Sequence, residues 1–562
     1  NASEIFLESN IFEGLKKMDF ESYQNILIEE KPNDIHRLYA RVGEYRSKLK
    51  VRINITILKN IITSVDKIVE FIETGVIEEL EALKQITPAG IIDMLQIKGI
   101  GPKKIRIIWT ELNIDTIGEL YYACNENRLV EAKGFGYKTQ EDVKKQIEFF
   151  WSNTGKNLYA NALMIANEFE AYLKKEIKDI IIECTGEMRR KCEIIHQIEF
   201  LLNTSNKTDL QLVITEKLAY ELQIISELEW KIITENQTII LCYFSDAPQF
   251  ANRQFTLTAH ANHLEKIENF YAEIFTKIAF ENEQAIYEHF QLPYIAPELR
   301  EGLNEIDKAK SGQIPTLIEL SDLQGSLHNH STYSDGIHSL KEMAEYCESL
   351  GYSYLGICDH SQSAFYANGL KADRVLAQQL EIKKLNAANE KFTIFSGIES
   401  DILSDGSLDY PAEILASFDF IVASIHSNLK MDEAKATARL LKAIENPYTT
   451  MLGHPTGRLL LARAGYSIDH TKVIDACAAN GVAIEINANP LRLDLDWRFI
   501  DYAISKGVML SINPDAHRKE GYLDMFYGIA VARKGGMSKA NCLNTFSREA
   551  IFDYFQQRKN KI

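Results

Sequence analysis

The stretch Leu323-Gln324-Gly325-Ser326-Leu327-His328-Asn329-His330 decides the fold of the C-terminal part of this chain, because a short apolar run ends there in two potential metal ligands. Five further runs, rich in β-branched and aliphatic residues, end in the same way and are each followed by a polar turn and a segment of helical period. Their ends are Cys358-Asp359-His360, Gly397-Ile398-Glu399, Ser424-Ile425-His426, Gly453-His454-Pro455 and Pro514-Asp515-Ala516-His517.

With the run 482–487 included, seven strands alternate with helices, which predicts a closed or nearly closed parallel β/α barrel. The C-terminal ends of the strands in such a barrel converge on one face, so ligands that are far apart in the sequence meet there. With Asp335, from the loop after the first run, nine ligands are expected: His328, His330, Asp335, His360, Glu399, His426, His454, Asp515 and His517.

A set of this size predicts a polynuclear metal centre. Imidazole and carboxylate suit zinc, manganese and iron, and nine ligands exceed the four positions of one tetrahedral zinc ion. Glu399 is the expected bridge, because it ends a middle strand and a carboxylate can bind two ions. A lone buried histidine is more often a core residue, but that interpretation does not explain six histidines at strand ends while seven lie elsewhere. The predicted chemistry is phosphoester hydrolysis.

Composition is that of a large globular protein. The length of 562 residues predicts three or four domains. There is no long uncharged apolar stretch, and Asn1-Ala2-Ser3-Glu4 begins no signal pattern, so a cytoplasmic protein without membrane association is expected. The net charge of −17 argues against a protein that coats nucleic acid by bulk attraction. The eight dispersed cysteines are expected to be reduced.

Residues 1–150 are expected to be helical, with two glycine hairpins, Ile97–Lys104 and Ala132–Thr139. A Gly-x-Gly turn that opens a helix, with lysine just after it, presents backbone N–H groups to a phosphate without reading sequence. The alternative is a pair of plain interhelical turns. The predicted DNA contacts are Gly99, Gly101, Lys103, Lys104, Gly134, Gly136 and Lys138.

Residues 151–302 mix helix and strand. Their most informative stretch is Thr185-Gly186-Glu187-Met188-Arg189-Arg190, whose arginines either meet a phosphate or belong to a solvated turn. The polar segment 303–320, with Gly312 and Pro315, is the predicted linker to the barrel at 321–562.

From about Asn54 to its end the chain resembles the bacterial family X DNA polymerases that carry a C-terminal polymerase-and-histidinol-phosphatase (PHP) domain. The motifs that carry the resemblance are Leu292–Glu301, Ser334-Asp335-Gly336, Gly453–Arg458 and Glu485–Pro490. The resemblance implies a multidomain fold: a helical helix-hairpin-helix region at 1–150, an α+β nucleotidyltransferase-like palm and thumb at 151–302, and a (β/α)7 PHP barrel at 321–562.

The resemblance also implies the chemistry of the barrel. The family binds three divalent ions, Mn²⁺ or Zn²⁺ with Fe²⁺ as a further alternative, and acts as a 3′–5′ exonuclease or 3′-end phosphodiesterase in base-excision repair. The implied ligand sets are His328, His330, Glu399 and Asp515 for the first ion; Glu399, His426 and His454 for the second; and Asp335, His360 and His517 for the third. The members of the first set are also the implied catalytic residues, and Arg458 becomes a candidate phosphate contact.

The polymerase half departs from the family. The Asp-x-Asp pair that holds two magnesium ions is replaced by Gln197-Ile198-Glu199, Glu187 replaces a phosphate-binding serine, and the stretch 237–243 has no aspartate. Because Mg²⁺ requires anionic oxygens in strict geometry, no Mg²⁺ and no polymerisation are expected at the palm. The stretch Leu58–Ser64 also lacks the glycine turn of the family, and residues 1–50 match it poorly.

Four functions compete at this point. The leading prediction is a DNA 3′-end nuclease or phosphodiesterase, acting on single-stranded or gapped DNA, whose polymerase half serves to bind DNA. The others are an active gap-filling polymerase with a proofreading barrel, a small-molecule phosphatase similar to histidinol phosphatase, and a DNA-binding scaffold whose metal ions only stabilise the fold. The sequence does not predict an oligomeric state.

Overall fold

The computed structural model describes residues 78–95, 97, 99–152, 156–235, 237–267 and 271–559. Contacts divide the described part of the chain into two compact units, one of residues up to Ile117 with Ala132–Gly134, and the other of Gly118–Glu131 with the residues from Phe135 onward. The expectations for 1–50 and 58–64 lie outside the described residues. The bounds of the four predicted segments stay predictions.

The first part of the described chain is helical, as predicted, and 78–152 contains no strand among its described residues. Helix α7 begins where Pro102 occupies its first turn, because proline has no N–H to leave unpaired there, and Gly101 is its N-cap. Ile105 and Ile108 are its buried residues. The helices are α5 (Glu78–Ile86), α6 (Ala89–Met94), α7 (Pro102–Thr110), α8 (Ile117–Asn125), α9 (Arg128–Glu131) and α10 (Tyr137–Ser152).

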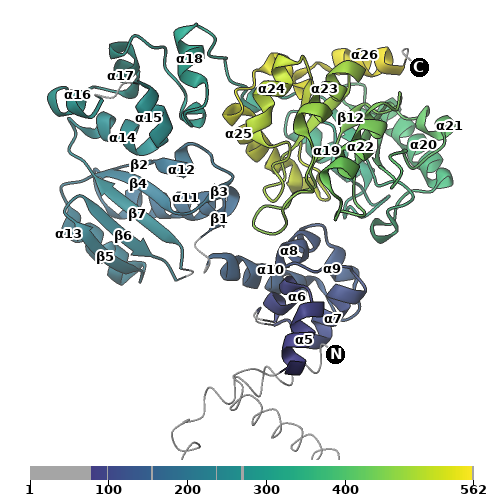
Figure 1. Ribbon diagram of the computed structural model, residues 1–562, viewed down its shortest axis with the longest axis horizontal. Coiled ribbons are helices and arrows are strands. Elements are labelled where there is room, and N and C mark those ends of the chain that lie inside the picture. The colour runs from purple at the N-terminus through teal and green to yellow at the C-terminus, as the bar shows by residue number, and fades with distance from the viewer. Residues whose placement is uncertain are drawn as a thin grey trace, which may run out of the picture. The chain divides into compact units, whose positions relative to one another are not determined.

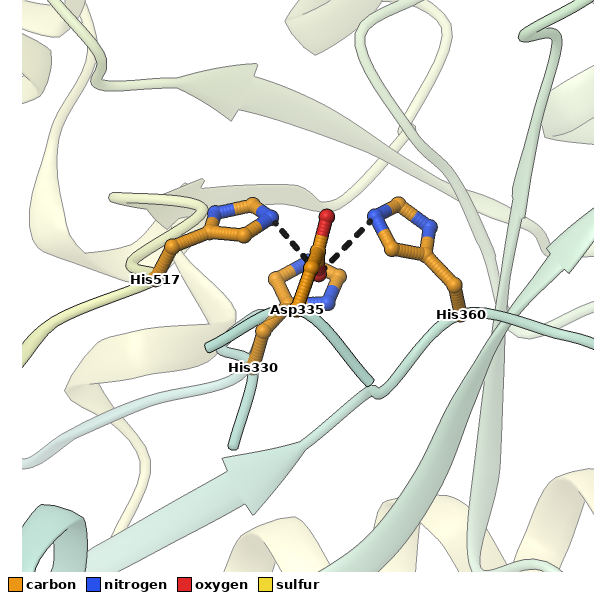
Figure 2. A group of neighbouring side chains, drawn as sticks. All are labelled: His330, Asp335, His360 and His517. Atoms are coloured by element: carbon orange, nitrogen blue, oxygen red, sulfur yellow. Dashed lines mark ion pairs between the residues drawn. The ribbon is translucent and has the colours of Figure 1, made fainter. Parts of the chain in front are cut away.

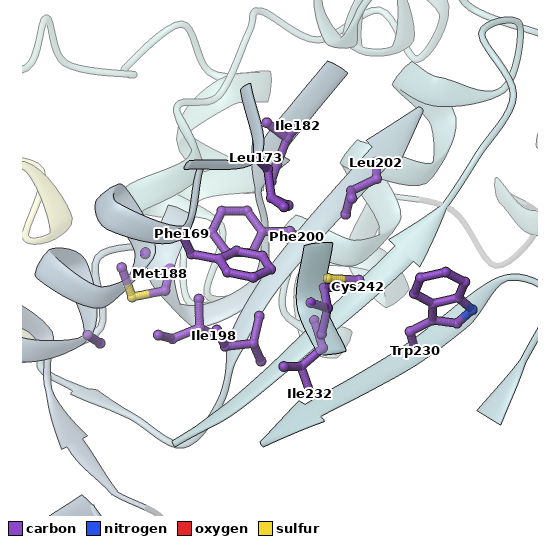
Figure 3. Close-up of a cluster of buried hydrophobic side chains, with 14 of the residues drawn as sticks. Phe169, Leu173, Ile182, Met188, Ile198, Phe200, Leu202, Trp230, Ile232 and Cys242 are labelled. Carbon is purple, nitrogen blue, oxygen red and sulfur yellow. The ribbon is translucent and has the colours of Figure 1, made fainter. Parts of the chain in front are cut away.

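A mixed five-stranded sheet forms the centre of the next part, in the order β2-β4-β7-β6-β5. Only β4 and β7 run parallel to each other. Figure 3 shows its core, in which Phe169 of α11 lies beside Phe200 of β4, with ring centroids 5.6 Å apart. The elements are β1 (Asn157–Leu158), α11 (Tyr159–Glu176), β2 (Ile181–Cys184), α12 (Gly186–Arg189), β3 (Ile194–Ile195), β4 (Ile198–Asn203), α13 (Lys207–Leu212), a π-helix (Val213–Lys217), β5 (Glu221–Ser226), β6 (Glu229–Ile233) and β7 (Ile239–Phe244).

A small helical layer follows the sheet, and its core includes Phe255 and Tyr287. Helix α18 (Glu305–Lys310) lies within the segment predicted as a linker, yet its Ile306 and Ala309 are buried in the same core. The first half of the predicted linker is therefore a packed helix, because its apolar residues recur at helical spacing. The other helices are α14 (Phe250–Thr258), α15 (Ala261–Ile267), α16 (Tyr271–Lys277) and α17 (Glu283–His289).

The C-terminal part is the predicted seven-stranded parallel barrel. Its strands follow one another in chain order from β8 to β14, and a parallel bridge between Asn329 and Ala516 brings the ends of the first and last strands together. The strands are β8 (Gly325–Ser326), β9 (Tyr354–Ile357), β10 (Thr393–Asp401), β11 (Phe420–Ser424), β12 (Met451–Leu452), β13 (Ala483–Asn487) and β14 (Leu510–Asn513).

Helices surround these strands (Figure 1), as expected when every strand of a parallel barrel is buried. The helices are α19 (Leu340–Ser349), α20 (Ala372–Ala388), α21 (Ala412–Leu415), α22 (Glu433–Ile444), α23 (His470–Asn480), α24 (Ile500–Ser505), α25 (Met525–Lys534) and α26 (Arg548–Lys559). Inside, Phe420 stacks on Phe555 of α26 at 4.9 Å. Among the described residues, no helix combines the length and apolarity that a membrane crossing needs.

Candidate metal centre

The barrel brings all nine predicted ligands together at the C-terminal ends of its strands. They form three overlapping groups in which one ligand atom from each member lies within 4.8 Å of the others. His454 belongs to none of these groups, but its Nε2 lies 3.0 Å from Oε1 of Glu399. The groups are His330, Asp335, His360 and His517; His328, His330 and Asp515; and His360, Glu399 and His426.

Figure 2 shows the first group, in which three imidazole rings surround the carboxylate of Asp335. Oδ1 of Asp335 lies 3.3 Å from Nε2 of His517 and 3.6 Å from Nε2 of His360. His330 joins this group as well as the second one. Its ring stacks on the ring of His517, with centroids 4.1 Å apart. The structure thus adds His330 to the set implied for the third ion.

The second group joins the first strand of the barrel to the last. Oδ1 of Asp515 lies 3.0 Å from Nε2 of His330 and 3.6 Å from Nε2 of His328. Asp515 has a φ of 53°, a left-handed conformation that non-glycine residues adopt at a cost. This backbone conformation belongs to the turn that carries both Asp515 and His517 toward the same face.

Glu399 lies at the centre of the cluster and is fully buried. Its Oε1 is 3.1 Å from Nε2 of His426, and its Oε2 is 2.8 Å from Nδ1 of His360. Oε1 is also 3.5 Å from Nε2 of His328. A carboxylate whose two oxygens face different histidines has the arrangement that a bridge between two ions needs. Glu399 does not end its strand as expected, since β10 continues to Asp401.

The donor set fits divalent cations. Several buried ligand atoms form no hydrogen bond, although a buried polar atom without a partner costs free energy. Cations coordinated by these nitrogens and oxygens would satisfy them. The atoms are Nε2 of His328, Nδ1 of His330, Oδ1 of Asp335 and Nδ1 of His454.

Electrostatics keeps the carboxylates of the cluster anionic. Burial alone would raise the pKa of Glu399, but His426, His328 and the other rings around it hold that pKa well below its ordinary value. For His330, burial together with His517 and a second imidazole lowers the pKa to about 3, so this ring is neutral. Burial alone would lower the pKa of His426, but Glu399 and Asp401 raise it to about 10. A metal ion would displace the proton from such a ring, since metal ions bind anionic carboxylates and neutral imidazoles.

Two carboxylates behind the ligands were missed by the sequence analysis. Oε1 of Glu485 lies 2.7 Å from Nδ1 of His328, and Oδ1 of Asp401 lies 2.6 Å from Nδ1 of His426. Such carboxylates fix the tautomer and the orientation of a ligating ring. Asp401 could have been found, because it follows Glu399 by two residues and so shares its face of the strand. Glu485 lies in a motif already singled out for the resemblance.

Arg458 is held by the loop after β13. Its Nε donates to the carbonyl of Arg492 at 2.8 Å, its Nη1 forms an ion pair with Asp496, and its Nη2 donates to the carbonyl of Leu493. Its role as a phosphate contact stays a prediction. Arg492 lies closer to the ligands, since its buried Nε is 3.7 Å from Oδ2 of Asp515.

Both glycine hairpins have the backbone that was predicted. Gly99 has a φ of 93° and Gly134 a φ of 89°, and a Cβ at either position would meet nothing within 4 Å. Among the described residues, nothing fills the space beside these two glycines. Lys103, in the first turn of α7, and Lys138, at the start of α10, are exposed, while Lys104 is half-buried. The contacts of these residues with DNA stay predictions.

In the sheet of the central part, Nε2 of Gln197 donates to Oε1 of Glu199 at 3.0 Å. Glu199 is paired in register with Leu241 on the parallel strand β7. Burial raises the pKa of Glu199 above its ordinary value. Within the described residues, every group of side chains that could hold a metal ion belongs to the barrel.

The two arginines after Gly186 do not belong to a solvated turn, because both pair with carboxylates of the protein. Their contact with a phosphate stays a prediction. Arg189 forms a two-bond ion pair with Glu283, each bond 2.8 Å long, and Arg190 pairs with Glu301 at 3.0 Å. Glu283 lies in α17 and Glu301 between α17 and α18, so both guanidinium groups join the end of α12 to the helical layer.

Two family models and two solved structures match parts of this chain. The PHP domain family matches residues 326–489, and the SAM-like helix-hairpin-helix tandem matches residues 91–148. Two solved structures are similar over 38% of this chain each. One is the histidinol phosphate phosphatase of Lactococcus lactis, complexed with zinc, L-histidinol and phosphate (18% identity, 94% of that chain, TM-score 0.32). The other is a ternary complex of Leishmania infantum polymerase beta (13% identity, 99% of that chain, TM-score 0.23).

The most extensive of these similarities is to the DNA polymerase/3′-5′ exonuclease PolX of Bacillus subtilis (strain 168). The two sequences are 35% identical over 500 residues, which covers 86% of this chain and 87% of the relative. The alignment is long enough to include the palm as well as the barrel. The chain therefore belongs to the bacterial family X DNA polymerases that carry a C-terminal PHP domain.

Proposed function

We propose that this protein is a metal-dependent 3′–5′ exonuclease or 3′-end phosphodiesterase that acts on DNA in repair, and that its polymerase half serves to bind DNA. The observation that carries the proposal is the complete ligand cluster around the buried Glu399. The similarity to a relative named as a polymerase and 3′-5′ exonuclease supports DNA as the substrate.

Three divalent ions, Mn²⁺ or Zn²⁺ with Fe²⁺ as the alternative, would be held by the three ligand sets implied by the resemblance. When bound, such ions activate water and neutralise the charge that develops on a phosphate. The chain's own residues position the ligands and keep water away from them. Glu399 would be shared by two of the sets. Glu485 and Asp401 orient His328 and His426, and burial of these groups excludes bulk water from their hydrogen bonds.

Several observations support a palm that does not polymerise. Nucleotidyl transfer depends on metal ions held by anionic oxygens. The amide of Gln197 is neutral and bonds to Glu199, while Leu241 lies beside Glu199 on the neighbouring strand. Arg189 and Arg190 are paired with carboxylates of the protein itself, which would compete with a nucleotide phosphate.

The first test of this function measures metal content and substrate choice together. Three ions per chain are expected after dialysis against Mn²⁺, since nine ligands with one bridge make three sites of three or four ligands. Stepwise release of nucleotides from 3′-labelled single-stranded or gapped DNA is expected, with far slower turnover of histidinol phosphate. One ion or none, or equal turnover of both substrates, would contradict the proposal.

The hairpins provide a second prediction. Replacing Lys103, Lys104 and Lys138 with alanine is expected to weaken DNA binding equally for all sequences, because phosphate contacts carry no sequence information. The slope of log affinity against log salt should fall by about 0.9 for each lost contact. Fluorescence anisotropy over a range of salt concentrations measures both quantities.

The matched control replaces three exposed lysines outside the hairpin sequences, Lys145, Lys174 and Lys175. This control removes the same charge, so it separates the local contacts from the effect of net charge. Equal losses in the two triple variants would mean that the hairpins are plain turns.

A further inference from the structure

The segment 118–131, which the sequence places between the two glycine hairpins, belongs to the same compact unit as the barrel. Tyr122 of this segment accepts a hydrogen bond from Nη2 of Arg492 at 2.8 Å, and the guanidinium lies over its ring at 4.5 Å. Glu119 forms an ion pair with Arg463. These contacts place the segment against the barrel loops that follow β12 and β13.

Glu126, at the end of helix α8, reaches the metal ligands themselves. It is 5% exposed, and its Oε2 forms an ion pair with Nδ1 of His517. Nδ1 of His517 is also 3.0 Å from the carbonyl of Asp515. Both partners are hydrogen-bond acceptors, so Nδ1 carries a proton, and Nε2, which faces Asp335 at 3.3 Å, is the nitrogen that would bind an ion.

We propose that Glu126 is a positioning residue of the metal centre. It holds the ring of His517 in the tautomer and orientation that the third ion requires, so that a segment of the helix-hairpin-helix region completes the barrel's site. The expected effect of Glu126 on catalysis rests on the proposed function. Its expected effect on the binding of the third ion does not.

The arrangement repeats what the barrel does for two other ligands. Glu485 holds Nδ1 of His328, and Asp401 holds Nδ1 of His426, in the same way that Glu126 holds Nδ1 of His517. The difference is that Glu485 and Asp401 come from the barrel's own strands, whereas Glu126 comes from outside it. Stability alone does not account for such a pair, because burying two charged groups costs about as much as their attraction returns.

The experiment compares Glu126→Gln and Glu126→Ala with the wild type in the full-length protein. Glu131→Gln is the control, because Glu131 is an exposed carboxylate of the same segment. Calorimetric titration of the metal-free proteins with Mn²⁺ measures the affinity of each of the three sites in the absence of substrate. Loss of an outer carboxylate weakens a metal site by about 10- to 100-fold, so we expect that loss for one ion of three.

Kinetics provides the second readout. In both Glu126 variants, kcat is expected to fall for DNA and also for a small diester, bis(p-nitrophenyl) phosphate, while KM for DNA stays unchanged, because the residue acts on the ion and not on DNA binding. Glu131→Gln should match the wild type in every measurement. A thermal melt identifies misfolding, and Glu126→Gln keeps the shape of the side chain if the alanine variant fails to fold.

Three results would overturn the inference: unchanged affinity for all three ions in both variants, a loss confined to KM for DNA, or an increase in activity, which would mean that the segment closes the site. A result that contradicts the proposed function can be told apart from one that contradicts this inference. If the wild type binds three ions but releases no nucleotide from DNA, the Mn²⁺ titration of the Glu126 variants still decides the role of this residue.

Discussion

Replacing Glu399 with glutamine is expected to remove two ions together and nearly all hydrolytic activity. Oε1 of this buried carboxylate lies 3.1 Å from Nε2 of His426, in the second implied ligand set, and Oε2 lies 3.7 Å from Nε2 of His330, in the first. An amide lacks the charge to join two cations there. Metal ions at such sites supply several kcal/mol of charge stabilisation, so kcat should fall by about 10³-fold or more. Metal analysis and nucleotide release from 3′-labelled DNA measure the two effects.

The fold of this variant should survive. The barrel has an apolar core below the ligands, formed by residues such as Leu327, Val422 and Met451, and it does not depend on the carboxylate. Glu413→Gln, which changes an exposed carboxylate of the same barrel, is the matched control and should keep all three ions. Loss of a single ion in Glu399→Gln, or activity within tenfold of the wild type, would show that Glu399 is not the bridge.

The second prediction is that the protein does not synthesise DNA. The protein is expected to add no nucleotide to a one-nucleotide gap with Mg²⁺, because Gln197 and Leu241 occupy positions beside Glu199 where anionic oxygens would have to hold the ions. The measurement belongs in the Glu399→Gln background, since an active nuclease would degrade any product. A family X polymerase that fills the same gap serves as the positive control.

Template-dependent extension that disappears on Glu199→Ala would show that the palm polymerises despite these substitutions. Extension that survives Glu199→Ala would instead come from a contaminating enzyme, because Glu199 is the carboxylate that remains of the replaced pair. The two outcomes therefore separate an active palm from an impure preparation.

The sequence by itself determined the barrel, its strand count and the residues that cluster at one face. Alternation of apolar runs with helical segments is a local property, and parallel strands of a barrel bring their C-terminal ends to one face whatever lies between them. For the same reason, His328 and His517 could be placed together although they are far apart in the chain. The hairpin turns were also predictable, because the positive φ of Gly99 and Gly134 is a requirement on single residues.

Only the tertiary structure decided which ligands share a group and what stands behind them. His330 belongs to a group with Asp335 and to another with Asp515, and this sharing depends on the orientation of its ring, which no local pattern encodes. Arg189 is neutralised by a carboxylate of a distant helix. Glu126 had no signal at all, since it is a single carboxylate in the turn between α8 and α9. Its contact with His517 exists because packing against the barrel brings that carboxylate to the ligand.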